Sequence, residues 1–446
     1  MEKEMSFRKS LVRIALPVTL QSLLQSSFSV IDQVMIGQLG EDSIAGIGLG
    51  GKFASIYSVV LGAVAAAAGI MIAQYLGQKN EKSVSRSFYV NLLLAMGIGL
   101  LFLLVSLVLP QTVMSLYTKE AVTRELAAEY LSIFAWSFLP MALSTMAAVM
   151  LRCMDAAVYP LAASFLSVIL NTGLNYVLIF GRMGFPQLGV RGAAIASVIA
   201  QVAASIVTLV LLLVQLQKRQ YKMSFSCRFA HAERMQYLGI LAPILVCEFM
   251  WSLGENVYAA IYGNIGTDAC AAMTMTGPIQ GLMIGALSGL AQAAGILIGK
   301  SLGNEEYDKA YKDSKRLMWY GLAGSLVLSV ALVLLGQFYV RIYNVEPQVR
   351  TMAYQLLVVF AIVSPVKVQN MILGGGIIRS GGKTQYVMWV DLIGTWIFGV
   401  PLGLLSAFVF DLPITYVYFI LSMEEVVRLL ISVVIFRKKR WMRTLE

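Results

Sequence analysis

Apolar runs of about twenty residues or more recur from one end of this 446-residue chain to the other. Each run is long enough to cross the roughly 30 Å hydrocarbon core of a bilayer as an α-helix. Strands of a membrane β-barrel would instead alternate apolar and polar residues, a pattern that this sequence does not show. Hydrophobic residues make up 58% of the chain and charged residues 13%, which excludes an ordinary soluble protein. The sequence therefore predicts an all-α polytopic membrane protein.

Twelve membrane spans are expected. The first is interpreted as a retained helix, because it lacks a small-residue cleavage site and further spans follow it. The predicted spans are residues 12–36, 44–75, 88–109, 127–150, 160–181, 189–214, 237–262, 271–299, 317–339, 351–377, 386–408 and 413–436.

Basic residues are divided unequally between the two sides of the predicted membrane. Assigning the loops alternately to the two sides places about 25 of the 34 Lys and Arg on the side that holds both termini. By the positive-inside rule this side is cytoplasmic, so we expect a cell (inner) membrane protein with both termini in the cytoplasm. We interpret the net charge of +10 as topology and attraction to membrane lipid, and not as nucleic-acid binding. The few basic residues expected on the other side are Lys119, Arg124, Arg182, Arg191, Arg341 and Arg350.

Several chemistries are excluded by what the sequence lacks. The four cysteines form no motif, and the single histidine, His231, lies in a long predicted cytoplasmic loop. We therefore expect no disulfide framework, no His-rich metal site and no cofactor. No GxxxxGK[ST] sequence is present for an ATP-driven motor. An intramembrane enzyme would need a Ser/His or paired-Asp motif at depth, and Asp32 and Asp391 fall in different halves, so no enzymatic activity is expected.

The chain matches itself when it is shifted by 226 residues. "GQLGEDSIAG" then lies over "GNIGTDACAA", and "AAAAGIMIAQYLG" lies over "AQAAGILIGKSLG". Six spans per repeat leave both halves in the same orientation, related by a pseudo-two-fold axis along the membrane normal. This predicts two six-helix lobes, residues 1–214 and 237–446, joined by a cytoplasmic linker loop, 215–236. In transporters such repeats enclose a site that opens alternately to each side, although two halves fused for structural reasons alone would show the same repeat.

Ionisable residues inside the spans are few. A charge at the bilayer centre costs about 2.5–3.5 kcal/mol on insertion scales, so each is a functional hypothesis. Asp32 lies about 28 Å along the first span from Arg13, in the outer half of the membrane. Asn171 and Asn175 share one face of the fifth span, and Ser197 lies in the sixth.

These four side chains suggest a cation site. Carboxylate, amide and hydroxyl oxygens suit a hard cation such as Na⁺, for which Asp32 would be the charged metal ligand. Alternatively, an apolar setting favours a protonated carboxyl, so Asp32 would carry H⁺. As a further alternative, Asp32 has a structural role and caps the loop that follows its helix by hydrogen bonding. The asparagines could likewise serve the packing of helices against one another.

Other polar and aromatic residues are candidates for a substrate cleft. Three of them precede Asp32 on its helix face, and two glutamates seven residues apart share a face of the seventh span. The seventh span also carries aromatic residues that could hold an organic cation by cation–π contact, with core packing as the alternative. The candidates are Gln21, Gln25, Phe28, Glu248, Trp251, Glu255, Tyr258 and Tyr262.

A further group of charges lies about 12–20 Å from the predicted cytoplasmic helix ends of the second half. Glu424 and Arg428 can pair along one helix. A proton relay and a neutralised structural network both remain open for this C-lobe charge cluster, which comprises Lys367, Asp391, Glu424, Glu425 and Arg428.

Seven segments occur in this order along most of the chain: "ALPVTLQSLLQSSFSVIDQVMIGQLG", "AAAAGIMIAQYLGQKN", "LNTGLNYVLIFG", "GVRGAAIAS", "AQAAGILIGKSLGNEE", "GGGIIRSGGKTQY" and "DLIGTWIFGVPLG". With these segments, over nearly its whole length, the sequence resembles the bacterial multidrug and toxic compound extrusion (MATE) transporters. The resemblance implies two six-helix lobes around a central cleft, and export of organic, often cationic, compounds in exchange for Na⁺ or H⁺. The family's N-lobe cation site carries over to Asp32, Asn171, Asn175 and Ser197. One branch of the family has Asp at the second helix-5 position, whereas Asn175 matches the NorM-like branch.

We therefore expect a secondary active multidrug efflux antiporter that works as a monomer by alternating access on small organic cations or drugs. The alternative is a flippase for a lipid-linked glycan or amphipathic lipid, which would need a cationic cleft for phosphate. The NorM-like branch also has a helix-7 Glu and a helix-10 Asp in a C-lobe cation site. Here the helix-10 segment "SPVKVQNMILGGG" carries Lys367 and no acid, so a second cation site in that lobe is not expected.

Overall fold

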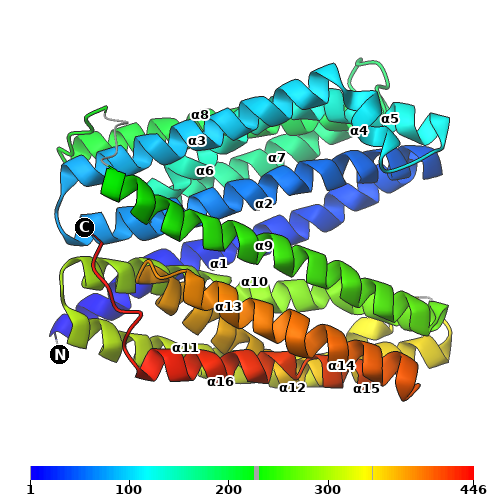
Figure 1. Ribbon diagram of the computed structural model, residues 1–446. Helices are drawn as coiled ribbons and strands as arrows, with labels where there is room; N and C mark the ends of the chain where they lie inside the picture. The colour runs from blue at the N-terminus through cyan, green and yellow to red at the C-terminus, as the bar shows by residue number, and fades with distance from the viewer. Residues whose placement is uncertain (1, 226–230, 344, 446) are drawn as a thin grey trace. The chain divides into compact units, whose positions relative to one another are not determined.

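The structure is a computed structural model that describes residues 2–225, 231–343 and 345–445, and the described chain is almost entirely helical (Figure 1). The helices of the first half are α1 (Glu2–Ile36), η1 (Gly37–Leu39), α2 (Glu41–Gly77), α3 (Glu81–Val108), α4 (Pro110–Ser115), α5 (Ala121–Phe134), η2 (Ala135–Ser137), α6 (Phe138–Cys153), α7 (Val158–Phe180) and α8 (Val190–Lys218). Those of the second half are α9 (His231–Ile265), α10 (Thr267–Gly303), α11 (Tyr307–Val340), α12 (Pro347–Asn370), η3 (Met371–Ile378), α13 (Gln385–Leu392), η4 (Ile393–Gly399), α14 (Val400–Leu404), η5 (Leu405–Val409), α15 (Ile414–Leu421) and α16 (Glu424–Arg437).

Ten helical stretches of the described residues are long and apolar enough to cross a membrane. They coincide with the second to eleventh predicted spans. The first predicted span lies in α1, some of whose side chains fall outside the described part of the chain. The twelfth falls on α15 and α16, which have 8 and 14 residues and are separated at Ser422 and Met423.

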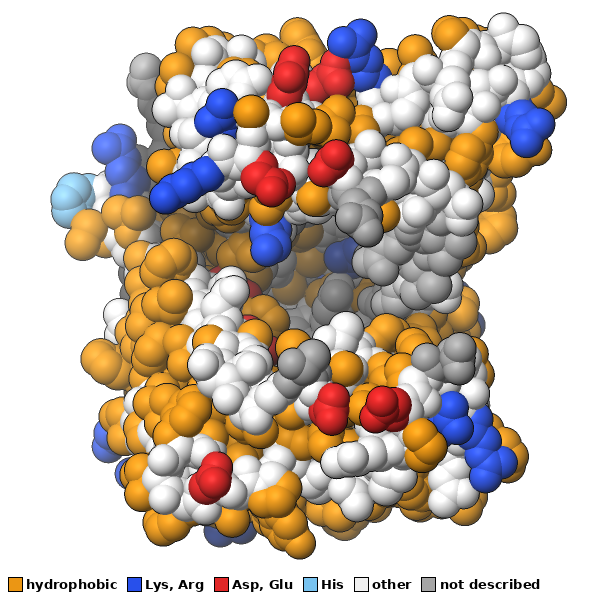
Figure 2. Space-filling view, turned by 90° about the vertical axis from the view of Figure 1, so that its right-hand side faces the viewer, with side chains coloured by type: hydrophobic (Ala, Val, Ile, Leu, Met, Phe, Trp, Pro, Cys, Tyr) orange, Lys and Arg blue, Asp and Glu red, His pale blue; other side chains and the backbone are white. Residues whose placement is uncertain are grey.

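The surface exposes many large apolar side chains, as is typical of a membrane protein. Large apolar side chains are exposed on the helices, among them Val210, Val327 and Leu334, which are 51–68% exposed. Figure 2 shows that hydrophobic side chains cover much of the visible surface and that charged ones are scattered across it. In water such a surface would aggregate, whereas in a bilayer it is matched by the acyl chains.

The contacts divide the chain into two compact units. Unit 1 consists of residues 1–22, 73–79 and 230–446, and unit 2 of residues 23–72 and 80–229. The start of α1 and the last turn of α2 thus pack with the second half of the chain. The predicted lobe boundaries remain a prediction, and the predicted linker loop 215–236 lies partly outside the described residues.

Two glycines related by the sequence repeat let the ends of α2 and α10 meet within unit 1. A Cβ on Gly303 would collide with the main-chain oxygen of Gln74, and a Cβ on Gly77 would collide with that of Lys300. Gln74 and Lys300 are also 226 residues apart, so the contact is reciprocal. Each glycine removes the side chain that would keep the two backbones apart.

The C-terminal tail packs at the same place. Gln74 Nε2 donates hydrogen bonds to the main-chain oxygens of Ser380 (2.6 Å) and Arg443 (3.1 Å), and its Oε1 accepts one from Leu445 N (2.8 Å). Trp441 is fully buried. The tail and the beginning of α1 lie at the same end of unit 1 (Figure 1). The tail is therefore part of the packing of this unit.

Three π-helical segments, η3, η4 and η5, interrupt the later helices of unit 1. In η4, a Cβ on Gly394 would meet Arg428 Cγ at 2.5 Å, and a Cβ on Gly399 would collide with Tyr258 and Glu424. The glycines thus make room for polar side chains against the helix backbone. Such π-turns are rare and are frequent at functional sites.

Candidate functional site

A chain of polar side chains connects α1, α7 and α8 in unit 2. Asn175 Nδ2 donates to Asp32 Oδ1 over 2.7 Å and to Asn171 Oδ1 over 2.8 Å. Asn171 Nδ2 donates in turn to Ser197 Oγ over 3.1 Å. Because the two asparagines are one turn apart on α7, their amides lie in a row between the carboxylate and the hydroxyl. The structure brings together the four residues predicted as a cation site, and their role remains a prediction.

One oxygen of this chain has no partner. Both neighbours of the Asn175 amide are acceptors, which turns its nitrogen toward them. Asn175 Oδ1 is buried and accepts no hydrogen bond from any described residue. Leaving a buried acceptor unsatisfied costs about 1–3 kcal/mol. An amide oxygen beside a carboxylate is a suitable ligand for a hard cation, so the residues present fit Na⁺.

The other predicted residues of α1 fall in two units. Gln21 is half-buried and belongs to unit 1, whereas Gln25, which is exposed, and Phe28, which is half-buried, belong to unit 2 with Asp32. A role of these three side chains in a substrate cleft remains a prediction.

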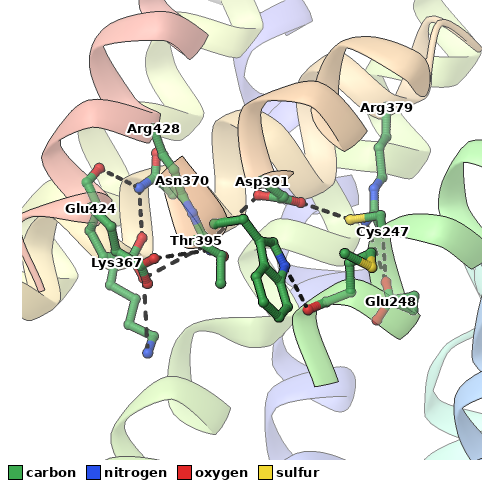
Figure 3. A network of polar contacts seen from close by, with 12 residues as sticks. Cys247, Glu248, Lys367, Asn370, Arg379, Asp391, Thr395, Glu424 and Arg428 are labelled. Carbon is green, nitrogen blue, oxygen red and sulfur yellow. Dashed lines mark hydrogen bonds and ion pairs between the residues drawn. The ribbon is translucent and has the colours of Figure 1, made fainter. Parts of the chain in front are cut away.

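Arg428 is the centre of the predicted C-lobe charge cluster, which lies in unit 1 (Figure 3). Its guanidinium nitrogens lie 3.7 Å from Glu424 Oε2, 3.8 Å from Asp391 Oδ1 and 3.9 Å from Glu425 Oε1. Tyr258 donates a hydrogen bond to Glu424 Oε2 over 2.5 Å. The predicted pairing of Glu424 with Arg428 is present, and it is one of three ion pairs that share the same arginine.

Lys367 of α12 lies at the edge of this cluster. Its Nζ is 4.0 Å from Glu425 Oε1, and its side chain is 41% exposed. Asn370, one turn along, donates to Glu425 Oε2 over 2.8 Å. Glu425 is thus held by an amide at hydrogen-bond distance, while the ammonium group stays at the outer limit of an ion pair.

A second pair of charges joins Arg379, the residue after η3, to α9. Two nitrogens of Arg379 lie 3.3 Å from Glu248 Oε1, and one donates to Cys247 Sγ over 3.4 Å. Cys247 Sγ donates in turn to Asp391 Oδ2 over 2.8 Å. Asp391 therefore connects the Arg428 cluster to the Arg379 pair, as Figure 3 shows.

A cavity of about 440 Å³ lies among these side chains in unit 1. Trp251 and Met371 form part of its apolar lining. Three acids and three bases line it, so its formal charge is zero. A cavity of this size accommodates a small organic molecule. The ionisable residues in its lining are Glu248, Lys367, Arg379, Asp391, Glu425 and Arg428.

The predicted aromatic stripe of α9 is divided by the fold. Trp251 is 47% exposed and lines the cavity. Tyr258 and Tyr262 are buried in an apolar core, where Tyr262 lies 6.2 Å from the ring of Tyr418. Glu255 is exposed. The two tyrosines are therefore packed in the core of unit 1, and a role of the stripe in a substrate cleft remains a prediction.

Sequence reasoning did not identify four members of this network. Arg379 and Asn370 flank the glycine run of η3, where polar groups in an apolar helix are a usable signal. Cys247 and Thr395 carry no such signal. Thr395, which lies in η4, accepts a hydrogen bond from Arg428.

Comparisons with known proteins agree with one another. The MatE family profile matches residues 17–177 and 243–405, one segment in each half of the chain. A "Probable multidrug resistance protein NorM" of Thermotoga maritima is 23% identical over 442 residues, which cover 99% of this chain and 94% of that protein. The "Uncharacterized transporter YisQ" of Bacillus subtilis is 22% identical over 89% of this chain and 87% of its own length.

Solved structures share the fold. A point mutant of the Vibrio cholerae MATE transporter VcmN has a TM-score of 0.89 at 17% identity, covering 99% of this chain and 100% of that chain. A MOP superfamily transporter from Pyrococcus furiosus has a TM-score of 0.86 at 17% identity, covering 97% and 96%. These likenesses confirm the predicted twelve-helix fold of two six-helix lobes.

Proposed function

We propose that this chain, which belongs to the MatE family of membrane transporters, is an antiporter that exports small organic cations across the cell membrane in exchange for Na⁺ or H⁺. As a member of this family it is a transporter and not an enzyme. The names of its relatives as multidrug resistance proteins support the cargo class. One observation supports the coupling of transport to a cation. The amide of Asn175 donates a hydrogen bond to Asp32, and its own buried oxygen, Oδ1, accepts no hydrogen bond from a described residue.

The proposed coupling ion binds at Asp32. Asp32 supplies the negative charge, Asn175 supplies the unsatisfied oxygen, and Asn171 with Ser197 fixes the orientation of the Asn175 amide. Binding of a cation neutralises the carboxylate and satisfies the buried oxygen, which stabilises the conformation that closes over the site. Because coupling between two sites is reciprocal, an ion that weakens cargo binding is itself bound more weakly when cargo is present.

The charge of the unit 1 cavity favours this proposal over a lipid-linked glycan flippase. A site for a lipid phosphate needs an excess of basic residues. The cavity has three acids and three bases.

The test is gradient-driven transport in proteoliposomes, with a pH gradient and a Na⁺ gradient imposed separately. The parent is expected to export a fluorescent organic cation under at least one of them. Asp32→Asn should reduce the driven rate by tenfold or more. Asp42→Asn, which changes an exposed acid at the start of α2, should leave the rate unchanged. Driven export by Asp32→Asn at the parent rate would overturn the proposal.

A further inference from the structure

We infer that unit 1 has a binding site for the headgroup of an anionic phospholipid, with the phosphate between the ammonium groups of Lys315 and Lys439 at the ring of Tyr311. The site lies where α11 begins and α16 ends, and none of these three residues lines the cavity described above. Because its geometry is fixed, it differs from the general attraction of basic loops to the membrane surface.

A stack of aromatic rings fixes the position of the site. The ring of Tyr311 stacks on that of Phe436 with the ring centroids 4.8 Å apart, and Phe436 stacks on Trp441 at 5.8 Å. Phe436 and Trp441 are buried. Between them the backbone turns through Lys439, whose φ of 55° is in the left-handed region that glycine favours. The half-buried ring of Tyr311 is therefore held from behind by buried side chains.

Two ammonium groups approach this one ring. Nζ of Lys315 lies 4.5 Å from the centroid of the Tyr311 ring, and Nζ of Lys439 lies 4.6 Å from it. Both lysines are exposed, and neither forms an ion pair with an acid in the described part of the chain. The ring attracts each cation, but the two like charges repel each other. A phosphate between them removes this repulsion and accepts hydrogen bonds from both.

The charge around the two lysines is positive. Asp313 Oδ1 lies 3.4 Å from a guanidinium nitrogen of Arg316, and Glu306 Oε2 lies 2.6 Å from Lys309 Nζ, so these two acids are already paired with other bases. The segment 437–443 adds five basic residues and no acid. The surroundings therefore favour an anionic ligand over a cationic one.

Both lysines lie at the depth expected for lipid headgroups. Lys315 comes just before the predicted span 317–339, and Lys439 comes just after the predicted span 413–436, at the helix ends predicted to be cytoplasmic. One turn along α11 from Lys315, the side chain of Trp319 is 69% exposed. Tryptophans gather at the level of the headgroups in membrane proteins. Basic sites between helices at this level bind anionic lipids.

Apolar side chains lead from the two lysines toward the predicted membrane interior. Leu326 and Val330 of α11 are exposed and fall on the same helix face as Lys315. Leu430 and Val434, in the last turns of α16, are also exposed. These side chains can contact the acyl chains of a lipid whose phosphate is at the lysines, whereas a soluble phosphate compound would leave them uncovered. The arrangement therefore favours a lipid over a free anion.

The test is native mass spectrometry of the full chain in detergent, titrated with dioleoyl-phosphatidylglycerol and with dioleoyl-phosphatidylcholine. The two lipids have the same acyl chains, and only the first has a net negative charge. We expect phosphatidylglycerol to bind about tenfold more tightly. Equal affinities of the two lipids would overturn the inference. Displacement of bound phosphatidylglycerol by an equal concentration of inorganic phosphate would indicate a site for the free anion and would also overturn it.

Two double variants locate the site. Lys315→Gln combined with Lys439→Gln removes both ammonium groups from the ring and should weaken phosphatidylglycerol binding by about tenfold. Lys312→Gln combined with Lys438→Gln removes the same charge from exposed neighbours on the same two segments and should weaken it by less than about twofold. Equal weakening by the two pairs would show a general electrostatic attraction, which would overturn the proposed site.

Tyr311 tests whether the ring organises the two lysines. Tyr311→Leu removes the surface that gathers the ammonium groups and should weaken phosphatidylglycerol binding by about threefold. Tyr311→Phe retains the ring and should bind the lipid as the parent does. Parent affinity in Tyr311→Leu would contradict the site as described. Because binding is measured without a gradient, the result does not depend on the transport proposal.

Discussion

The two sets of buried acids differ in what surrounds each residue. Asp32 is held by the Asn175 amide, and among the described residues it has no ion-pair partner. Glu424, Glu425 and Asp391 share Arg428. An acid that is already paired gains less from an incoming cation than one held by a neutral amide. This contrast is the residue-level reason for assigning coupling to Asp32.

Asn175 provides a test at the same scale. Asn175→Leu removes both the donor that holds Asp32 and the unsatisfied oxygen, so the apparent affinity for the coupling ion should fall by about tenfold, or roughly 1.4 kcal/mol. The measurement is the dependence of dye export on the concentration of the coupling ion. Asn264→Leu, an exposed asparagine near the end of α9, should leave this dependence unchanged. Identical ion dependence in Asn175→Leu and the parent would contradict the assignment.

At the scale of helices, glycines decide where backbones approach. The reciprocal contact of Gly77 and Gly303 joins the ends of α2 and α10, and the glycines of η4 admit Arg428 and Glu424 against a π-turn. In both places the absence of a Cβ lets a neighbouring backbone or side chain lie directly against the helix backbone. Glycine thus permits close approach both in the contact between the repeat-related ends of α2 and α10 and in the C-lobe charge cluster.

The α2–α10 contact predicts different effects on stability for two glycine substitutions in α10. Gly303→Ala would force its Cβ against the main-chain oxygen of Gln74 and should destabilise the protein by about 1–3 kcal/mol. Gly281→Ala has nothing within 4 Å of the added Cβ and should be neutral or slightly stabilising, because Ala favours the helix. Thermal unfolding in detergent measures both. Equal melting temperatures for the two variants would contradict the close contact.

At the scale of the whole molecule, topology follows from charge distribution. Ten helical stretches of the described chain are suitable for crossing a membrane, and the basic residues gather in the loops predicted to be cytoplasmic. By the positive-inside rule, these loop charges predict that the loops and both termini face the cytoplasm.

Cysteine labelling tests this orientation. In a variant whose four native cysteines are replaced, Lys119→Cys should react with an impermeant maleimide in intact cells. Lys312→Cys, in a predicted cytoplasmic loop, should react only after the membrane is permeabilised. The reverse pattern would place the termini outside.

The sequence by itself determined the helical membrane class, the ten spans that coincide with helices of the structure, the repeat, and the four polar residues, Asp32 among them, that the structure joins in one hydrogen-bonded chain. These features are readable because hydropathy, helical spacing and residue identity are local properties. Asn171 and Asn175, one turn apart, share a face in any helix.

Only the tertiary structure decided the rest. It pairs Arg379 with Glu248 and brings Cys247 within hydrogen-bond distance of Asp391. It also buries Tyr258, which donates a hydrogen bond to Glu424. These contacts join residues more than 130 positions apart, and no local sequence pattern specifies which distant side chains meet. The cavity and its charge balance are consequences of that packing.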